Sequence, residues 1–123
     1  MQRASTKQKP RLVVLLGATG VGKTELSIRL ARYFSTEILS ADSRQIYHEL
    51  PIGTAAPSLA EQAAVPHHFV GTHSVLEAYS AASFEADALA VLDKLFQEKE
   101  IVLVSGGSMM YIDALCQGID SIP

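Results

Sequence analysis

The strongest chemical pattern in this sequence is a run of eight residues of a kind that binds phosphate. The run is Gly17, Ala18, Thr19, Gly20, Val21, Gly22, Lys23 and Thr24, and it fits the P-loop pattern G-x-x-x-x-G-K-[ST]. Glycines let the backbone curl so that its N–H groups point at phosphate oxygens, and Lys23 adds a positive charge. The Thr24 hydroxyl can ligate a magnesium ion that bridges two phosphates. We therefore predict a site for a diphosphate or a longer phosphate chain, rather than a glycine-rich turn without a ligand.

Asp42 is a second candidate for chemistry, because it follows the short strand that Ile38 and Leu39 are expected to begin. ATPases and GTPases normally hold magnesium with a carboxylate at the end of a later apolar strand. Here the later run, 101–104, continues into Ser105-Gly106-Gly107-Ser108 without an acid. Asp42 could act as a base, contact magnesium through water, or cap the turn that follows it. Spacing alone leaves these roles open.

Polar residues continue beyond Asp42 as Ser43, Arg44 and Gln45. The planar guanidinium of Arg44 suits a phosphate or the face of a base, and the amide of Gln45 can pair with an adenine edge. An exposed loop that is polar without a specific role is the alternative.

The histidines do not predict a zinc site. Adjacent His67 and His68 point in different directions on most backbones, and no cysteine or carboxylate lies at ligand spacing. Cys116 lies in an apolar segment and is interpreted as a small buried residue rather than a nucleophile. Three tyrosines could line a cleft or cap the core: Tyr47, Tyr79 and Tyr111.

The elements that position these residues alternate between strand and helix. Apolar runs predict strands at 12–16, from 38 to near 42, and at 101–104. Helical spacing of Leu26, Leu30 and Phe34, with Ala31 beside them, predicts a helix after the P-loop. Further helices are expected from the capping box at 58–61 to Pro66, along a stripe in the region 84–96, and after Ser108 towards Cys116. The stripe consists of Phe84, Ala88, Val91, Leu92, Leu95 and Phe96.

This alternation predicts an α/β fold, a P-loop NTPase-like parallel sheet with flanking helices. About three strands are expected, which is fewer than most sheets have, so the sheet is predicted to be incomplete. Because the carboxyl ends of parallel strands meet at one edge, Asp42, the P-loop and the Gly106-Gly107 turn should face one cleft.

Composition agrees with one globular domain. The chain has 123 residues, 48% of them hydrophobic, with a flexible basic tail expected at 1–11 and a domain at 12–123. The net charge of −3 provides no overall attraction to nucleic acid, so any RNA contact needs a local patch. Short apolar runs and a single cysteine lead us to expect a soluble, cytoplasmic protein without a membrane segment.

With these residues identified, the chain resembles the amino-terminal portion of the tRNA dimethylallyltransferase family, also called tRNA isopentenyltransferases. The resemblance covers nearly all of 11–123, and its most specific part is Ala41-Asp42-Ser43-Arg44-Gln45 about twenty residues after the P-loop. The other matching segments are Ile52 to Ala55, Val65 to His68, Tyr79 to Phe84, and Gly106-Gly107-Ser108 followed by Tyr111.

The resemblance implies transfer of a dimethylallyl group from its diphosphate to the exocyclic amine of the adenosine 3′ of the anticodon. Asp42 would be the base, Lys23 and Thr24 would also be catalytic, and residues 17–24 would bind the diphosphate with magnesium on Thr24. The tRNA contacts would come from Asp42, Ser43, Arg44, Gln45 and Ser108. The implied partners are the tRNA anticodon stem-loop and dimethylallyl diphosphate, and we expect a monomer.

Several positions depart from the family pattern. Ala18, Gly20 and Val21 differ within the P-loop, Met109 adds bulk near the cleft, and Ala56 replaces a lysine. Family members are also longer, so the chain is expected to be a fragment that binds diphosphate poorly and modifies tRNA little or not at all. The alternative functions are a small P-loop kinase or nucleotide-binding protein, and an inactive phosphate-binding remnant.

Overall fold

The structure, a computed structural model, describes residues 10–16, 23–48 and 57–120. Strands and helices alternate in these segments, as the apolar patterns predict. In chain order the elements are β1 (Arg11–Leu16), α2 (Lys23–Tyr33), β2 (Ile38–Ser40), α3 (Leu59–Ala64), β3 (His67–His68), α4 (Ala81–Leu95), β4 (Ile101–Gly106) and α5 (Met109–Asp120).

The strands of the described segments form a single four-stranded sheet in the order β1-β4-β2-β3. All of the pairs are parallel, with Leu15 and Ser40 both level with Ser105 of the central strand β4. The expected number of about three strands was one too low, because the prediction did not include the short strand β3. Two residues are too few for an apolar run, and β3 forms only because His67 and His68 pair with β2.

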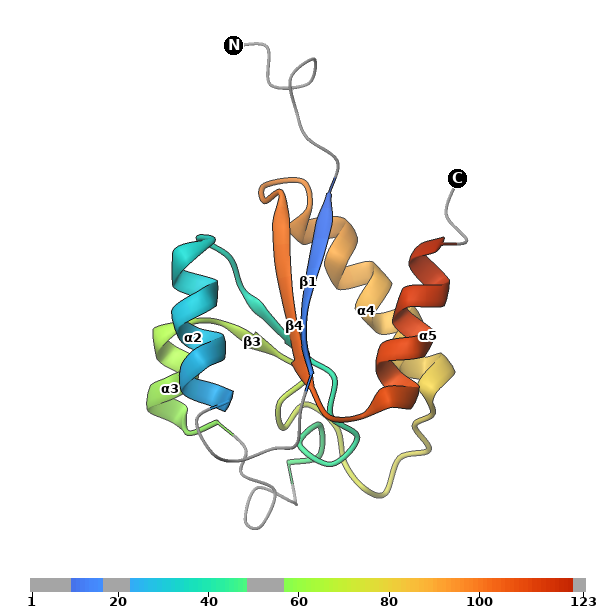
Figure 1. Cartoon of the computed structure of the whole chain (residues 1–123). Coiled ribbons are helices and arrows are strands. Elements are labelled where there is room, and N and C mark those ends of the chain that lie inside the picture. The colour runs from blue at the N-terminus through green and yellow to red at the C-terminus, as the bar shows by residue number, and fades with distance from the viewer. Residues whose placement is uncertain (1–9, 17–22, 49–56, 121–123) are drawn as a thin grey trace.

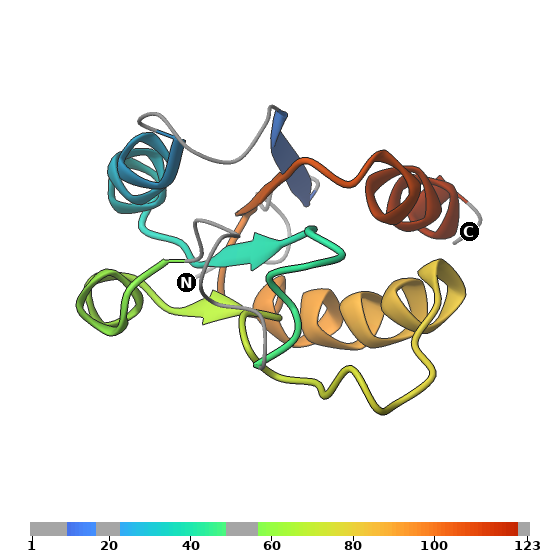
Figure 2. The same cartoon turned by 90° about the horizontal axis from the view of Figure 1, so that it is seen from below.

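Helices cover both faces of this sheet, which gives three layers (Figure 1). The pair α2 and α3 lies on one face and the pair α4 and α5 on the other, as the view from below also shows (Figure 2). The ends of β1 and β4 point towards the lower edge of Figure 1, where α5 begins. This α/β arrangement of parallel strands and flanking helices agrees with the predicted fold class.

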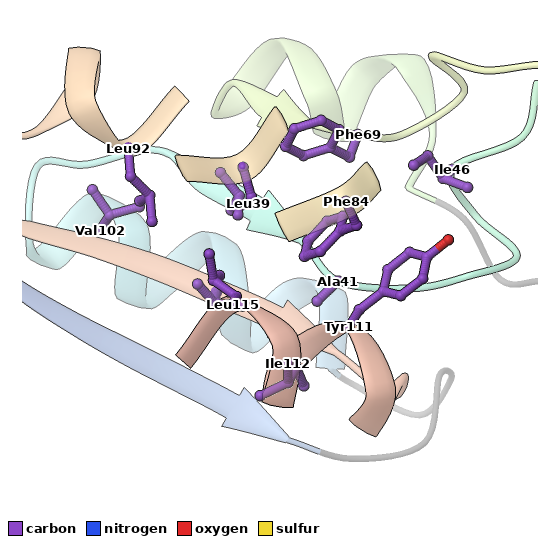
Figure 3. Packing of buried hydrophobic residues seen from close by; sticks show 12 residues of the cluster. Leu39, Ala41, Ile46, Phe69, Phe84, Leu92, Val102, Tyr111, Ile112 and Leu115 are labelled. Atoms are coloured by element: carbon purple, nitrogen blue, oxygen red, sulfur yellow. The ribbon is translucent and has the colours of Figure 1, made fainter. Parts of the chain in front are cut away.

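The larger core lies between the sheet and the helices α4 and α5. The buried face of α4 consists of Phe84, Ala88 and Leu92, with Val91, Leu95 and Phe96 packed beside them, as the stripe predicts. Tyr111, Ile112 and Leu115 supply the facing side of α5 (Figure 3). Burial of these apolar side chains is the main stabilising contribution on this face of the sheet.

The face that α2 turns to the sheet agrees with the prediction at Ala31 but not at Leu26. Its buried residues are Ser27 and Ala31, whereas Leu26 is 44% exposed. Ala31 packs with Ile38, Val65 and Leu103, and Leu30 lies at the margin of this smaller cluster. The periodicity of the leucines was therefore misleading, because the close approach of the helix to the sheet selects small residues for the contact.

Two sequence predictions about local structure are confirmed. Ser58 and Glu61 form the capping box of α3, with Ser58 N donating to Glu61 Oε1 at 2.8 Å and Glu61 N donating to Ser58 Oγ at 3.1 Å. The helix ends before Pro66 with Val65 as its C-cap.

At the start of the chain, Arg11 belongs to β1 and not to the predicted tail, while residues 1–9 lie outside the described segments.

Histidine 67 gives the fold a predictable dependence on pH. Burial lowers the pKa of His67 from its ordinary value of 6.5, although a hydrogen bond to the Val65 carbonyl at 2.7 Å opposes the shift. As the pH falls through 6.5, the unfolded chain takes up a proton at this residue before the folded chain does. The free energy of unfolding should therefore fall between about pH 7 and pH 5.

Urea titrations at several pH values within this range would measure the effect. The variant His67→Gln can still donate a hydrogen bond to Val65 but cannot titrate, so its stability should decline less steeply with falling pH. Identical pH profiles for the two proteins would contradict the assignment of the effect to His67.

Within the described segments, no helix combines the length and the apolar character needed to cross a membrane.

Candidate functional site at the carboxyl edge of the sheet

Strands β2 and β4 end side by side, and their ends form the base of the candidate site. Ala41 N donates to the Ser105 carbonyl at 2.9 Å, and Ser108 N donates to the Ala41 carbonyl at 3.2 Å. Gly106 approaches the Ala41 backbone so closely that a Cβ atom at position 106 would overlap its carbonyl oxygen. The residue that follows this tight junction is Asp42, as the topology of a parallel sheet predicts.

The Asp42 carboxylate caps the turn that carries the polar segment. Its Oδ1 atom accepts hydrogen bonds from Arg44 N at 2.8 Å and from Gln45 N at 3.0 Å, and the residue is buried. The capping role that the sequence left open is therefore present. Because both bonds go to one oxygen, they fix the orientation of the carboxylate, which is compatible with a chemical role for the second oxygen.

Lys23 and Thr24 begin the α2 helix at the same edge of the sheet as Asp42. Both are half-buried. Burial lowers the pKa of Lys23 from 10.5, and the negative charge of Asp42 opposes this shift. The two charges therefore interact across the candidate site. A helix start that carries a lysine is an attractive place for an anion.

The remaining residues of the P-loop pattern, 17–22, lie outside the described segments. The phosphate cradle that the glycines are expected to form therefore stays a prediction. What the structure describes is the helix that the pattern predicts directly after it.

The polar segment divides into exposed and buried residues. Ser43 and Arg44 are exposed, as a contact with a large partner requires, whereas Gln45 is only 8% exposed. Gln45 instead lines a pocket of about 310 Å³ together with Tyr47, His48 and residues of the α3 region. Any contact between its amide and a base would have to be made within that pocket.

Ser108 lies immediately before α5 and is hydrogen-bonded to Ala41, the residue before Asp42. Its carbonyl accepts Ile112 N at 3.1 Å, so the residue forms the start of the helix, and its side chain is half-buried. The neighbouring Met109 and Met110 are 52% and 74% exposed. The bulk expected from Met109 therefore does not fill the junction between β4 and β2.

An aromatic cluster beside Asp42 is a feature that the sequence did not resolve. Tyr111 stacks on Phe84 at a centroid distance of 4.5 Å, and Tyr79 packs edge-on against Tyr111 at 6.4 Å. Figure 3 shows the Tyr111 ring beside Phe84, with its hydroxyl directed away from Leu115 and Ile112. Burial raises the pKa of Tyr111, and the charges of Tyr47 and Asp42 raise it further. Asp42 therefore lies within electrostatic range of both Lys23 and Tyr111.

A second contact joins this cluster to α4. The Tyr79 hydroxyl donates to Asp87 Oδ2 at 2.8 Å, and the His73 ring packs against Tyr79 at a centroid distance of 4.3 Å. Burial raises the pKa of Tyr79, as does this hydrogen bond. Tyr79 precedes α4 and Asp87 lies within it, so helical spacing does not predict this contact, and only the chain direction before α4 brings the two side chains together.

The adjacent histidines 67 and 68 turn to different partners. His68 Nε2 lies 2.7 Å from Glu37 Oε1, while the adjacent His67 turns to the Val65 carbonyl. Among the described residues there is no group of three or more side chains from histidine, cysteine, aspartate and glutamate that could hold a metal ion. Cys116 is partly buried against the core.

Comparison with known proteins identifies the family. A family model described as IPP transferase matches residues 45–123, which is more than half of the chain. The chain belongs to the IPP transferase family. Among curated relatives, tRNA dimethylallyltransferase 1 from Bacteroides fragilis is 59% identical over 112 residues, and that from Phocaeicola vulgatus is 60% identical over 112 residues. Each match covers 91% of this chain and 37% of the relative.

Solved structures agree with this assignment. A tRNA isopentenylpyrophosphate transferase from Bacillus halodurans is 34% identical with a TM-score of 0.80, and the match covers 87% of this chain and 35% of that one. A eukaryotic dimethylallyltransferase described as acting on tRNA is 34% identical with a TM-score of 0.78, covering 88% and 27%. The P-loop NTPase-like fold class is thereby confirmed, and this IPP transferase family member spans about a third of the length of its relatives.

Proposed function

We propose that residues 12–123 form the amino-terminal part of a P-loop prenyltransferase domain that transfers a dimethylallyl group to tRNA. The observation that carries the proposal is the convergence of Lys23, Thr24 and Asp42 at the carboxyl edge of the sheet in a member of the IPP transferase family. The substrates would be dimethylallyl diphosphate and the exocyclic amine of the adenosine 3′ of the anticodon.

The donor diphosphate would bind at residues 17–24. Breaking the bond between the allylic carbon and oxygen leaves negative charge on the diphosphate. The Lys23 ammonium and the N–H groups at the start of α2 are suited to stabilise that charge, since their attraction grows as the charge develops. The allylic carbon becomes positively charged in the same step.

Asp42 would act on the acceptor. The adenine amine forms a bond to the allylic carbon and loses a proton, which the carboxylate accepts. Capping by the amides of Arg44 and Gln45 holds the carboxylate in one orientation, and this reduces the motion that a productive approach must overcome. The products would be the modified base and free diphosphate.

The exposed side chains of Ser43 and Arg44, with Ser108 at the start of α5, would contact the tRNA. Arg44 can bind a phosphate with two parallel hydrogen bonds or stack on an unpaired base. Gln45 would contribute from within its pocket. The target base must leave its stack, which costs less free energy in a loop than in a duplex.

Magnesium fits this set of donors. A hydroxyl oxygen of Thr24, completed by diphosphate oxygens and water, is the kind of environment that magnesium prefers. When bound, the ion would neutralise part of the charge on the leaving diphosphate.

Binding of dimethylallyl diphosphate and of ATP by the 123-residue chain would test the donor site. We expect inorganic diphosphate and dimethylallyl diphosphate to bind more tightly than ATP. Because a kinase needs its nucleotide, tenfold tighter binding of ATP would overturn the proposal in favour of a small P-loop kinase.

A transfer assay needs the remaining part of the enzyme, since the chain spans 37% of its relatives. A chimera that joins this chain to the rest of the Bacteroides fragilis relative, 59% identical, provides it.

A further inference from the structure

Two buried hydroxyl groups join the α2 helix to the end of strand β4. Ser27 Oγ lies 2.8 Å from the Lys23 carbonyl oxygen and 3.0 Å from Ser105 Oγ. Ser27 is 2% exposed and Ser105 is 9% exposed. A buried hydroxyl costs free energy unless it is hydrogen-bonded, and here each one satisfies the other.

The contact between helix and strand requires both hydroxyls, whereas the bond to the Lys23 carbonyl requires that of Ser27 alone. A hydroxyl group carries one proton and can accept two hydrogen bonds, so Ser27 cannot donate to the Lys23 carbonyl and to Ser105 at the same time. When the Ser27 proton goes to the carbonyl, Ser105 supplies the proton of the second bond. Replacing either serine by alanine therefore breaks the connection between helix and strand.

The connection continues from Ser105 to the residue before Asp42. The Ser105 carbonyl accepts Ala41 N at 2.9 Å, and Ser105 is level with Ser40 in the sheet. The chain of contacts therefore runs from the Lys23 carbonyl through Ser27 and Ser105 to Ala41, the neighbour of Asp42.

Ser27 is the buried residue of α2 nearest to Lys23 and Thr24. The other buried residue of the helix, Ala31, packs one turn further away in an apolar cluster. Apolar contacts tolerate small sliding movements, whereas a hydrogen bond requires a defined distance and direction. The hydroxyl pair is thus suited to fix the position of the helix start.

We propose that Ser27 and Ser105 are positioning residues, which hold Lys23 and Thr24 at a fixed distance from Asp42. This role rests on the proposed function, because it matters for alignment of the donor diphosphate with the base. It assigns to the hydroxyl pair a contribution to ligand binding, beyond the stability that any buried hydrogen bond provides.

Titration of the 123-residue chain with inorganic diphosphate tests the first part of this role. The variants are Ser27→Ala, Ser105→Ala and the double variant. We expect each single variant to bind diphosphate about threefold to tenfold more weakly, as loss of one hydrogen bond implies. The double variant should bind no more weakly than the single ones, since both remove the same connection.

Ser80→Ala is the matched control. Ser80 caps α4 by accepting Ser83 N at 3.1 Å, far along the chain from α2, so its loss lowers stability without touching the pair. Affinity for diphosphate should stay at the parent value in this variant. If Ser27→Ala fails to fold, Ser27→Cys keeps the approximate volume while weakening both bonds.

The backbone amide signals of Asp42 and Arg44 in NMR spectra provide a readout that does not depend on the ligand. Ser27→Ala should shift them although Ser27 lies on another element, and Ser80→Ala should not. Should the parent protein fail to bind diphosphate, the proposed function fails, and these signals alone decide the positioning role. Unmoved amide signals overturn the positioning role. So does an affinity for diphosphate that stays at the parent value in both single variants, or one that falls no further than it does in Ser80→Ala.

Discussion

Asp42→Asn is expected to reduce the rate of dimethylallyl transfer by about 100-fold to 10,000-fold in the chimera with the Bacteroides fragilis relative. The asparagine amide cannot accept the proton that the adenine amine releases. Its side-chain oxygen can still accept hydrogen bonds from Arg44 N and Gln45 N, so the turn should keep its shape. Radiolabelled transfer to tRNA measures the rate.

Donor binding separates this effect from damage to the phosphate site. Removing a negative charge that interacts with Lys23 should leave the affinity for diphosphate unchanged or slightly raised. Asp42→Ala is the companion variant, because it also loses the cap and should lower the free energy of unfolding by about 1 kcal/mol. A transfer rate within threefold of the parent in Asp42→Asn would exclude the role as base.

Gly106→Ala should produce the largest loss of stability, about 3 kcal/mol in the free energy of unfolding. The added Cβ would lie 2.6 Å from the Ala41 carbonyl carbon and closer still to its oxygen. These are backbone atoms between two paired strands, so neither side can move without breaking the hydrogen bond between Ala41 and Ser105. The thermal midpoint should fall by about 10 °C.

Gly107→Ala is the control for this substitution. Gly107 is the next residue along the chain, but it is exposed, so alanine there should change stability by less than about 1 kcal/mol. Calorimetric melting of the three proteins compares them directly. Equal melting temperatures for Gly106→Ala and the parent would show that the junction can open without cost.

Short-range pattern was sufficient for most of the elements. Five consecutive apolar residues predict β1 whatever it packs against, and the recurrence of Phe84, Ala88 and Leu92 defines one face of α4. The same reasoning placed Asp42 beside the start of α2, since the order of strands and helices fixes which loops share an edge.

Other features depended on contacts between distant segments. Strand β3 has only two residues and forms through pairing with β2, so no pattern within its own residues predicts it. Leu26 fits the apolar period of α2, yet the helix lies so close to the sheet that Ser27 and Ala31 take the buried positions. The burial of Gln45 likewise depends on a distant segment, the loop after β3.

The sequence by itself determined that this chain has a phosphate-binding pattern before a helix, a carboxylate after a strand, and the order of elements that brings them to one edge. These features are local in the chain, and local geometry follows from residue type and spacing. Tertiary structure alone decided that Asp42 caps its turn and that Ser27 meets Ser105 across 78 positions. Such contacts form between side chains whose separation depends on how the whole sheet and its helices pack.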